Sequence, residues 1–364
     1  MTRRELLLLA DKFNPEKHDP EGMLMSEKLD GNRCWWDGGV SRGVPTIDVP
    51  WANIWDKDGK TLKNKIKPVA SGLWSRYGNP VMAPDWFLDS LPENVSFDGE
   101  LYAGHGNFQY VQKAVRKDVP IDSEWKGIRY EVFGCPTYAQ VLQDGLIKLS
   151  GSVTYIRDID QHYCLLFAGA RLGVDAEALE AQASLPFCEE LDKIAEICMS
   201  NASELCLPVP HAVCESADQV LRAAKQVSDA GGEGMMLRDP DSVWFPKRRP
   251  FILKVKPRHD DEATVVGFFA GRKGKTGQFL GKLGGIIVDW KGVVFEIGTG
   301  LTHADRELFP VDVDRAKQVP GKEIVLVNGT PTFKVGTVVT FSYRELSNDG
   351  VPKEASYMRV RDDV

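Results

Sequence analysis

The sequence predicts an α+β protein in two parts, a larger domain of strands and helices over 1–258 and a smaller all-β barrel over 259–364. The length of 364 residues fits two domains of roughly 100–200 residues each. Strand-like and helix-like stretches alternate before Pro257, whereas short apolar runs between Gly-rich turns follow it. A composition of 43% hydrophobic and 27% charged residues is typical of a globular protein with a sizeable core.

The first elements are expected to be a helix and a pair of strands. The apolar run Leu6–Ala10 predicts an N-terminal helix that packs on the body, because it is far shorter than the ~20 residues of a membrane span. No signal-peptide cleavage site follows this run. Residues 23–43 predict two strands joined by the turn Asp37-Gly38-Gly39, and 44–96 is rich in loops.

The rest of the larger domain alternates between strands and helices. Strands are expected over 97–102, 125–133, 234–238 and 251–256, and helices within 171–204 and over 217–230. Ser216 is the expected N-cap of that last helix, which ends at Gly231-Gly232.

The smaller domain predicts a barrel of the OB kind. Six strand-like runs and one helical stretch, 303–309, follow the boundary at Arg258. The runs are 263–271, 284–290, 292–300, 323–327, 336–346 and 356–362.

Charge and cysteine content limit the classes of function. The net charge of −7 argues weakly against nucleic acid, but basic residues gather at 247–249, 254–258 and 272–275. The seven cysteines include no CxxC pair, so neither a zinc site nor a disulfide framework is indicated, and a reducing cytoplasm is expected.

Lys28 is a candidate nucleophile, since it stands two residues before Asp30-Gly31 with Arg33 beyond. A lysine becomes nucleophilic when desolvation or neighbouring cations lower its pKa. Arg33, Lys254 and Lys256 could supply the cations, and Asp30 could orient the amine. Taken alone, however, Lys-x-Asp-Gly is also typical of an ordinary surface turn.

Later motifs strengthen the interpretation of Lys28 as a nucleophile, because they follow it in a particular order. They are KLDGNR (28–33), SRG (41–43), FDGELY (97–102), YEVF (130–133), EGMMLR (233–238) and LKVKP (253–257). This set and order resembles the covalent nucleotidyltransferase superfamily, specifically the ATP-dependent DNA ligases of minimal phage and bacterial type. The segments 99–117 and 333–363 resemble the same ligases, so the resemblance covers most of the chain.

The resemblance implies an adenylation domain of antiparallel sheets and helices followed by an OB-fold domain. It also implies that Lys28 attacks the α-phosphate of ATP to form lysyl-AMP, that AMP moves to the 5′-phosphate of a nick, and that the 3′-hydroxyl then seals the strand. ATP, Mg²⁺ (with Mn²⁺ as a substitute) and nicked duplex DNA are the implied cofactors and partner. A monomer in the cytoplasm of a bacterial or phage-infected cell is expected, without membrane attachment or targeting signal.

The resemblance also assigns roles to individual residues. Lys254 and Lys256 would meet the α-phosphate. Glu100 would meet the ribose or the metal, Glu233 would hold the metal, and Phe133 would stack on adenine. Further nucleotide-binding or DNA-binding positions are Ser26, Glu27, Leu29, Arg33, Arg42, Arg248, Arg249, Lys273 and Lys275, and Arg361 would orient pyrophosphate. Each of these residues also has an ordinary interpretation as core or solvated surface.

Three positions depart from the family pattern. Many members carry an acid two residues before the nucleophile, where it reads the adenine amino group, but this chain has Ser26. The Phe-Asp of the aromatic motif is Phe133-Gly134, and the tail reads RDDV from Arg361 without the usual lysine. Only 27 residues precede Lys28, so clamping of DNA is expected to rely on the two-domain core and inserted loops.

Other functions remain open from the sequence. An RNA ligase or a GTP-dependent capping guanylyltransferase would share the covalent lysine chemistry. A nucleic-acid-binding OB protein with an inactive nucleotide site is disfavoured by the intact Lys28, Glu100 and Glu233. A NAD⁺-dependent ligase is disfavoured because its zinc-finger cysteines and nicotinamide-binding domain are missing.

Overall fold

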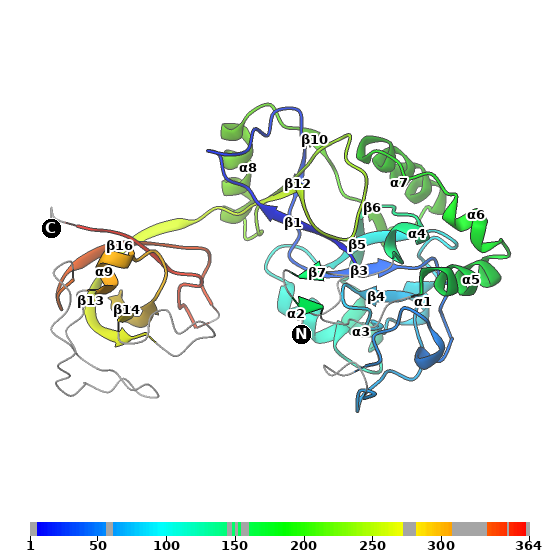
Figure 1. Ribbon diagram of the computed structural model, residues 1–364, viewed down its shortest axis with the longest axis horizontal. Helices are drawn as coiled ribbons and strands as arrows, with labels where there is room; N and C mark the ends of the chain where they lie inside the picture. The colour runs from blue at the N-terminus through cyan, green and yellow to red at the C-terminus, as the bar shows by residue number, and fades with distance from the viewer. Residues whose placement is uncertain are drawn as a thin grey trace. The chain divides into compact units, whose positions relative to one another are not determined.

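The computed structural model describes residues 6–55, 61–143, 148–149, 152–153, 160–271, 282–307, 333–347 and 349–361. The chain divides into two compact units, Met1–Lys256 and Pro257–Val364 (Figure 1). Each unit has its own hydrophobic core. Within the described residues, no helix combines the length and apolarity needed to cross a membrane.

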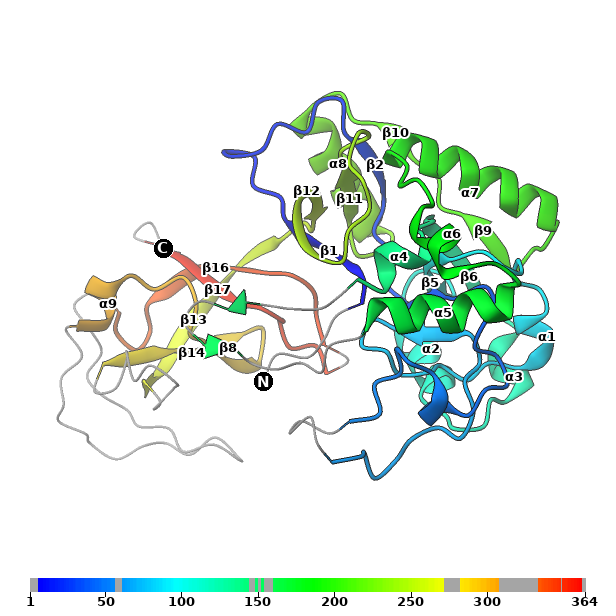
Figure 2. The same ribbon diagram turned by 45° about the vertical axis from the view of Figure 1, so that its right-hand side comes forward.

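The first sheet of the larger unit, sheet A, has five strands. Their order is β1 (Leu8–Lys12), β12 (Lys247–Val255), β11 (Met235–Arg238), β2 (Leu24–Glu27) and β10 (Ala212–Val213). The helix α8 (Ala217–Asp229) covers one face of this sheet (Figure 2). The Ser216 hydroxyl accepts a hydrogen bond from the Gln219 amide at 3.2 Å, so the predicted N-cap is confirmed.

The predicted N-terminal helix is wrong. The last three residues of the apolar run, Leu8–Ala10, belong to β1, which pairs in parallel with β12 at the edge of sheet A. Leu6, Leu7 and Leu8 are all buried, so a strand and its approach bury what an amphipathic helix would have buried. A run of five apolar residues is compatible with a helix or with a buried strand, because it shows no periodicity that distinguishes them.

Sheet B lies in the same unit and also has five strands. Their order is β4 (Leu73–Ser75), β3 (Asn32–Trp36), β5 (Phe97–Tyr102), β6 (Arg129–Gly134) and β9 (Cys206–Pro208). Alternation along β3 places Cys34 and Trp36 in a core with four helices, α1 (Asp85–Leu88), α2 (Phe108–Val115), α3 (Asp122–Trp125) and α7 (Phe187–Asn201). Trp35 faces the other way, into a core with α4 (Tyr138–Val141), α5 (Gln161–Leu172) and α6 (Ala176–Glu180). Both tryptophans are therefore packing residues.

The expected hairpin over 23–43 is also wrong, although both strands exist. β2 belongs to sheet A and β3 to sheet B, so the chain passes from one sheet to the other through residues 28–31. The turn at Asp37-Gly38-Gly39 follows β3 and begins the loop-rich region, which contains a short 3₁₀ turn, η1 (Thr46–Asp48). Two further short strands, β7 (Lys148–Leu149) and β8 (Ser152–Val153), pair only with each other.

The smaller unit contains one antiparallel sheet among its described residues. Its strands are ordered β15 (Val293–Ile297), β14 (Leu283–Trp290), β13 (His259–Ala270), β16 (Val338–Tyr343) and β17 (Ser356–Val360), with the short helix α9 (His303–Glu307). In these residues the sheet stays open along most of its two edge strands, β15 and β17. A single bridge, Thr299 to Ser356, joins the ends of those strands. The predicted strand 323–327 lies outside the described residues.

Candidate functional site

A cavity of about 640 Å³ lies between the inner faces of sheets A and B in the larger unit. Alternate residues of β2, β11 and β12 line one side of it, among them Ser26, Met236 and Lys254. Asp98 and Glu100 of β5, Arg33 of β3 and Phe133 of β6 line the other side. The predicted motifs, which are far apart in sequence, therefore meet in one concave site.

Lys28 enters this cavity from the crossover between the two sheets. Its backbone amide donates to the Gly234 carbonyl at 2.8 Å, which extends the pairing of β2 with β11. Gly234 has φ +134°, a conformation that favours glycine. Gly31 passes so close to β5 that a Cβ atom there would lie 2.2 Å from the Leu101 carbonyl oxygen. A glycine is thus required at position 31 for the backbone to pass this close to β5.

The carboxylate of Glu233 links the lysine of KLDGNR (28–33) to a lysine of LKVKP (253–257). Lys28 Nζ contacts Oε2 of Glu233, and Lys256 Nζ contacts Oε1 of the same residue. The Glu233 side chain is only 10% exposed, so water screens these pairs weakly. Lys254 lies two residues before Lys256 and lines the same cavity. The structure therefore brings together Lys28, Glu233, Lys254 and Lys256, as predicted.

Glu100 faces this cationic group from sheet B. Burial raises the pKa of Glu100 to about 7, and the positive charges of Lys28 and Arg33 oppose that rise. The nearby carboxylates Asp98 and Asp30 raise the pKa further. A carboxyl group whose pKa is near neutrality in a cleft is typical of a functional site.

Arg33 is held by a partner that the sequence reasoning missed. Its Nε and Nη2 donate to the two carboxylate oxygens of Asp98 at 2.9 and 2.6 Å, and Nη1 donates to the Leu8 carbonyl. Trp244 Nε1 donates to the same carboxylate at 3.0 Å. The Arg33 guanidinium lies 5.2 Å from the Phe133 ring centroid. Asp98 shares a strand face with Glu100, and this two-residue spacing is the signal that could have identified it.

The remaining nucleotide-binding candidates lie around the nucleophile. Ser26 is buried on β2, and Leu29 lines the cavity. Glu27 also lines the cavity, and its Oε1 lies 2.7 Å from His105 Nε2. Asp30 lies in the crossover, within electrostatic range of Glu100.

The predicted DNA-binding arginines are dispersed. Arg42 lies away from the cavity and pairs with Asp85 at the start of α1 and with Asp89, the residue directly after that helix. Arg248 is exposed on the cavity rim and contacts the Ala10 carbonyl, whereas Arg249 lies 3.8 Å from the Phe245 ring centroid.

The other predicted basic residues belong to the smaller unit. Lys273 and Lys275 lie outside the described residues. Arg361 forms an ion pair with Glu262 there.

The donor set suits a metal ion held jointly with a phosphate ligand. The described residues contain no cluster of three or more His, Cys, Asp or Glu side chains able to hold an ion alone. Glu100 and Glu233 offer hard oxygen atoms on opposite sides of the lysine. Mg²⁺ is commonly bound by one or two carboxylates together with substrate phosphates, so the absence of a complete protein cage among these residues is compatible with such an ion.

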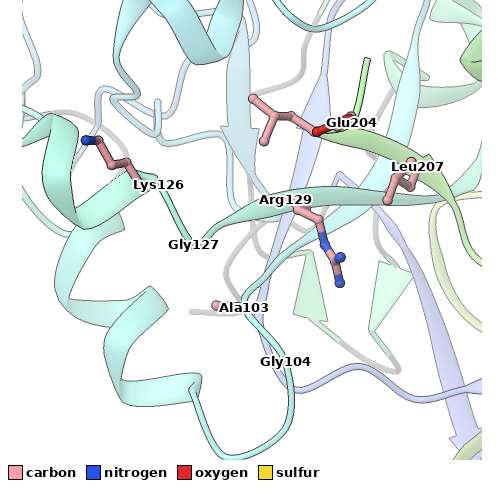
Figure 3. Close-up of a pocket in the computed structure, with 8 residues that line it drawn as sticks. Ala103, Gly104, Lys126, Gly127, Arg129, Glu204 and Leu207 are labelled. Carbon is pink, nitrogen blue, oxygen red and sulfur yellow. The ribbon is translucent and has the colours of Figure 1, made fainter. Parts of the chain in front are cut away.

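A second hollow of about 650 Å³ shares no lining residue with the lysine cavity. Its charged residues are Lys126, Arg129 and Glu204, beside Gly104 and Gly127. The charged ends of Lys126 and Arg129 point in different directions (Figure 3). The polar groups do not converge, so the lysine cavity is the candidate site.

Known proteins with similar sequences are DNA ligases. Residues 273–361 match the family model described as "DNA ligase OB-like domain". A DNA ligase of Haemophilus influenzae is 24% identical over 360 residues, which cover 98% of this chain and 92% of the relative. A DNA ligase of Methanocorpusculum labreanum is 30% identical over 200 residues, which cover 53% of this chain and 34% of the relative.

A solved structure from a structure–function study of Lig E DNA ligases has a similar fold. It superimposes with a TM-score of 0.58 over 98% of both chains, at 23% identity. The predicted fold, an α+β domain followed by an OB-like domain, is therefore confirmed, with an open sheet among the described residues of the second unit.

Proposed function

We propose that this chain is an ATP-dependent DNA ligase, which seals 3′-hydroxyl/5′-phosphate nicks in duplex DNA as a monomer through a lysyl-AMP intermediate; its similarity to DNA ligases over 98% of its length and its DNA ligase OB-like segment support the proposal. The observation that carries the proposal is the convergence of Lys28, Glu233 and Lys256 in one cavity with Glu100 and Phe133 opposite. Phosphoryl transfer needs positioned groups and neutralised charge, which this set supplies.

In the first step, Nζ of Lys28 attacks the α-phosphorus of ATP. A P–N bond forms, the bond from that phosphorus to the bridging oxygen breaks, and pyrophosphate leaves with the electron pair. The ammonium must first lose a proton to solvent, and the carboxylate of Glu233, which contacts Nζ, orients the amine. Lys254 and Lys256 then neutralise the charge on the α-phosphate oxygens.

In the second and third steps AMP moves from the lysine to the DNA and is then released. The 5′-phosphate at the nick displaces the lysine from the α-phosphorus, and the 3′-hydroxyl displaces AMP as the phosphodiester forms. In this proposal Phe133 stacks on adenine and Arg248 meets a DNA phosphate, and both side chains line the cavity.

A divalent cation, Mg²⁺ with Mn²⁺ as a substitute, would be held by Glu100 and Glu233 with the phosphates. When bound, it neutralises charge on the transferred phosphoryl group. Glu100 must then be ionised, which its pKa of about 7 permits at and above neutral pH.

Nucleotide transfer to the protein tests the proposal directly. The protein is incubated with ATP labelled at the α-phosphate, and we expect acid-labile, base-stable label on wild type and none on Lys28→Ala. Lys225→Ala is the matched control, because Lys225 is an exposed lysine on α8 that pairs with Asp229. Label that persists in Lys28→Ala, or no label on wild type, would contradict the mechanism.

The substrate is tested separately with nicked DNA and nicked RNA. The relatives named above are DNA ligases, which does not favour an RNA ligase or a capping guanylyltransferase. We expect sealing of nicked DNA, whereas sealing of RNA alone would support the alternative.

A further inference from the structure

A row of four side chains crosses the cavity face of sheet A. Ser26 on β2 lies opposite Met236 on β11, which lies opposite Lys254 on β12. On the other side of β2, Ala212 pairs with Met25 and Val213 with Leu24. The antiparallel register therefore places His211 beside Ser26, with both side chains on the same face. All four residues of the row line the cavity.

The hydrogen bonding of His211 fixes which nitrogen carries its proton. Nδ1 lies 2.8 Å from the Val209 carbonyl oxygen, and a carbonyl can only accept, so Nδ1 is the donor. In the neutral ring Nε2 is then an acceptor, and it makes no hydrogen bond with another residue in the described part of the chain.

The ring of His211 is held in orientation by its neighbours. It meets Phe187 edge-on, with ring centroids 5.2 Å apart and an interplanar angle of 81°. Phe187 is itself fixed by the Arg238 guanidinium, 3.8 Å from its ring centroid. Burial lowers the pKa of His211 to about 4, and the positive charge of Arg238 acts in the same direction. The ring is therefore neutral at physiological pH, with a fixed acceptor.

We propose that His211 selects the nucleotide base, its Nε2 accepting a hydrogen bond from the 6-amino group of adenine. The inference rests on the proposed function of this cavity as an ATP site. Adenine carries a donor at position 6, whereas guanine carries a carbonyl oxygen there, which would face the lone pair of Nε2. An acceptor with no donor capacity discriminates between the two bases.

Ser26 cannot make this distinction by itself. A hydroxyl both donates and accepts, so it can hydrogen bond to either base. The acid that reads the adenine amine in many family members is absent at this position. His211 directly precedes the adjacent strand, β10, and its Nε2 is an acceptor that cannot also donate, unlike the serine hydroxyl.

Three triphosphates test the proposal through the rate of lysyl-nucleotide formation. They are ATP, GTP and purine riboside triphosphate, which has hydrogen in place of the 6-amino group. For wild type we expect labelling by ATP about 10-fold faster than by purine riboside triphosphate, with GTP slower still. In His211→Phe the ATP and purine riboside rates should agree within about 2-fold, because the acceptor is gone.

A second variant keeps a polar side chain, in case His211→Phe does not fold. His211→Gln presents either an amide donor or an acceptor, so its GTP-to-ATP ratio should rise by about 5-fold or more. His162→Phe, an exposed histidine of α5, is the matched control and should retain the wild-type ratios. Unchanged ratios in both His211 variants would overturn the role of His211 in base selection and leave the proposed function of the cavity standing. Wild type that forms no adduct with any triphosphate would overturn the proposed function and this inference with it.

Discussion

At the scale of single residues, Glu100 determines how the site responds to pH. Burial raises its pKa from an ordinary 4.5 to about 7. Between these values the folded protein keeps a proton that the unfolded chain has released. The carboxyl group therefore lowers the free energy of unfolding as pH rises through this window.

Removing this charge should stabilise the protein at high pH. Glu100→Gln keeps the shape without the ionisable group, so the difference in free energy of unfolding between variant and wild type should widen by about 2–3 kcal/mol from pH 5 to pH 8. Urea denaturation at both pH values measures it, with Glu177→Gln on α6 as the exposed control. An equal difference at pH 5 and pH 8 would show that Glu100 titrates normally.

Residue identities predicted which side chains converge in the cavity better than the contacts that support them. Lys28, Glu233 and Lys256 were predicted together because motif order is visible in a sequence. Asp98 was missed because its role depends on Arg33 and Trp244, which reach it from distant segments. Arg42 was assigned to the site, but its guanidinium is turned toward α1 by Asp85 and Asp89. Such pairings depend on tertiary structure and leave no periodic signal.

At the scale of elements, local signals identified strands and helices but not their partners. The α8 helix was predictable because Ser216 and Gly231 delimit it within the chain. The Leu6–Ala10 run was misassigned because parallel pairing with β12 involves residues about 240 positions away. The 23–43 segment was misassigned because alternation reveals a strand but not the sheet to which it belongs.

The Arg33–Asp98 pair links elements of both sheets. Arg33 on β3 binds Asp98 on β5 and the Leu8 carbonyl on β1. Asp98→Asn removes the charge without changing the volume, which leaves the Arg33 guanidinium uncompensated in a largely buried position. We expect a loss of about 3–5 kcal/mol in the free energy of unfolding.

A second arginine–aspartate pair provides the control for this substitution. Arg42 pairs with Asp89, whose side chain is 63% exposed. Asp89→Asn should therefore change the free energy of unfolding by no more than about 1 kcal/mol. Chemical denaturation followed by circular dichroism compares the two variants, and equal losses would show that Asp98 is not acting as a buried counter-ion.

At the scale of the whole molecule, the candidate nucleotide site belongs to one unit. Every residue that lines the cavity precedes Pro257, and the smaller unit has a separate core around Phe268, Val288 and Phe341. A ligand that binds only the folded cavity stabilises the part of the chain that forms it, by about 2.7 kcal/mol at a concentration 100 times its Kd. AMP is the suitable probe because it carries the base, ribose and α-phosphate without a pyrophosphate.

We therefore expect AMP to slow amide hydrogen exchange in β2, β11 and β12 and to leave β13, β14 and β16 unchanged. The exchange of these strands is measured by mass spectrometry with and without AMP. Lys254→Ala should reduce the protection, because the α-phosphate loses a cation that faces it across the cavity. Protection that extends equally through both units would mean that they unfold as one cooperative body, and the nucleotide would then stabilise the whole chain rather than the unit that binds it.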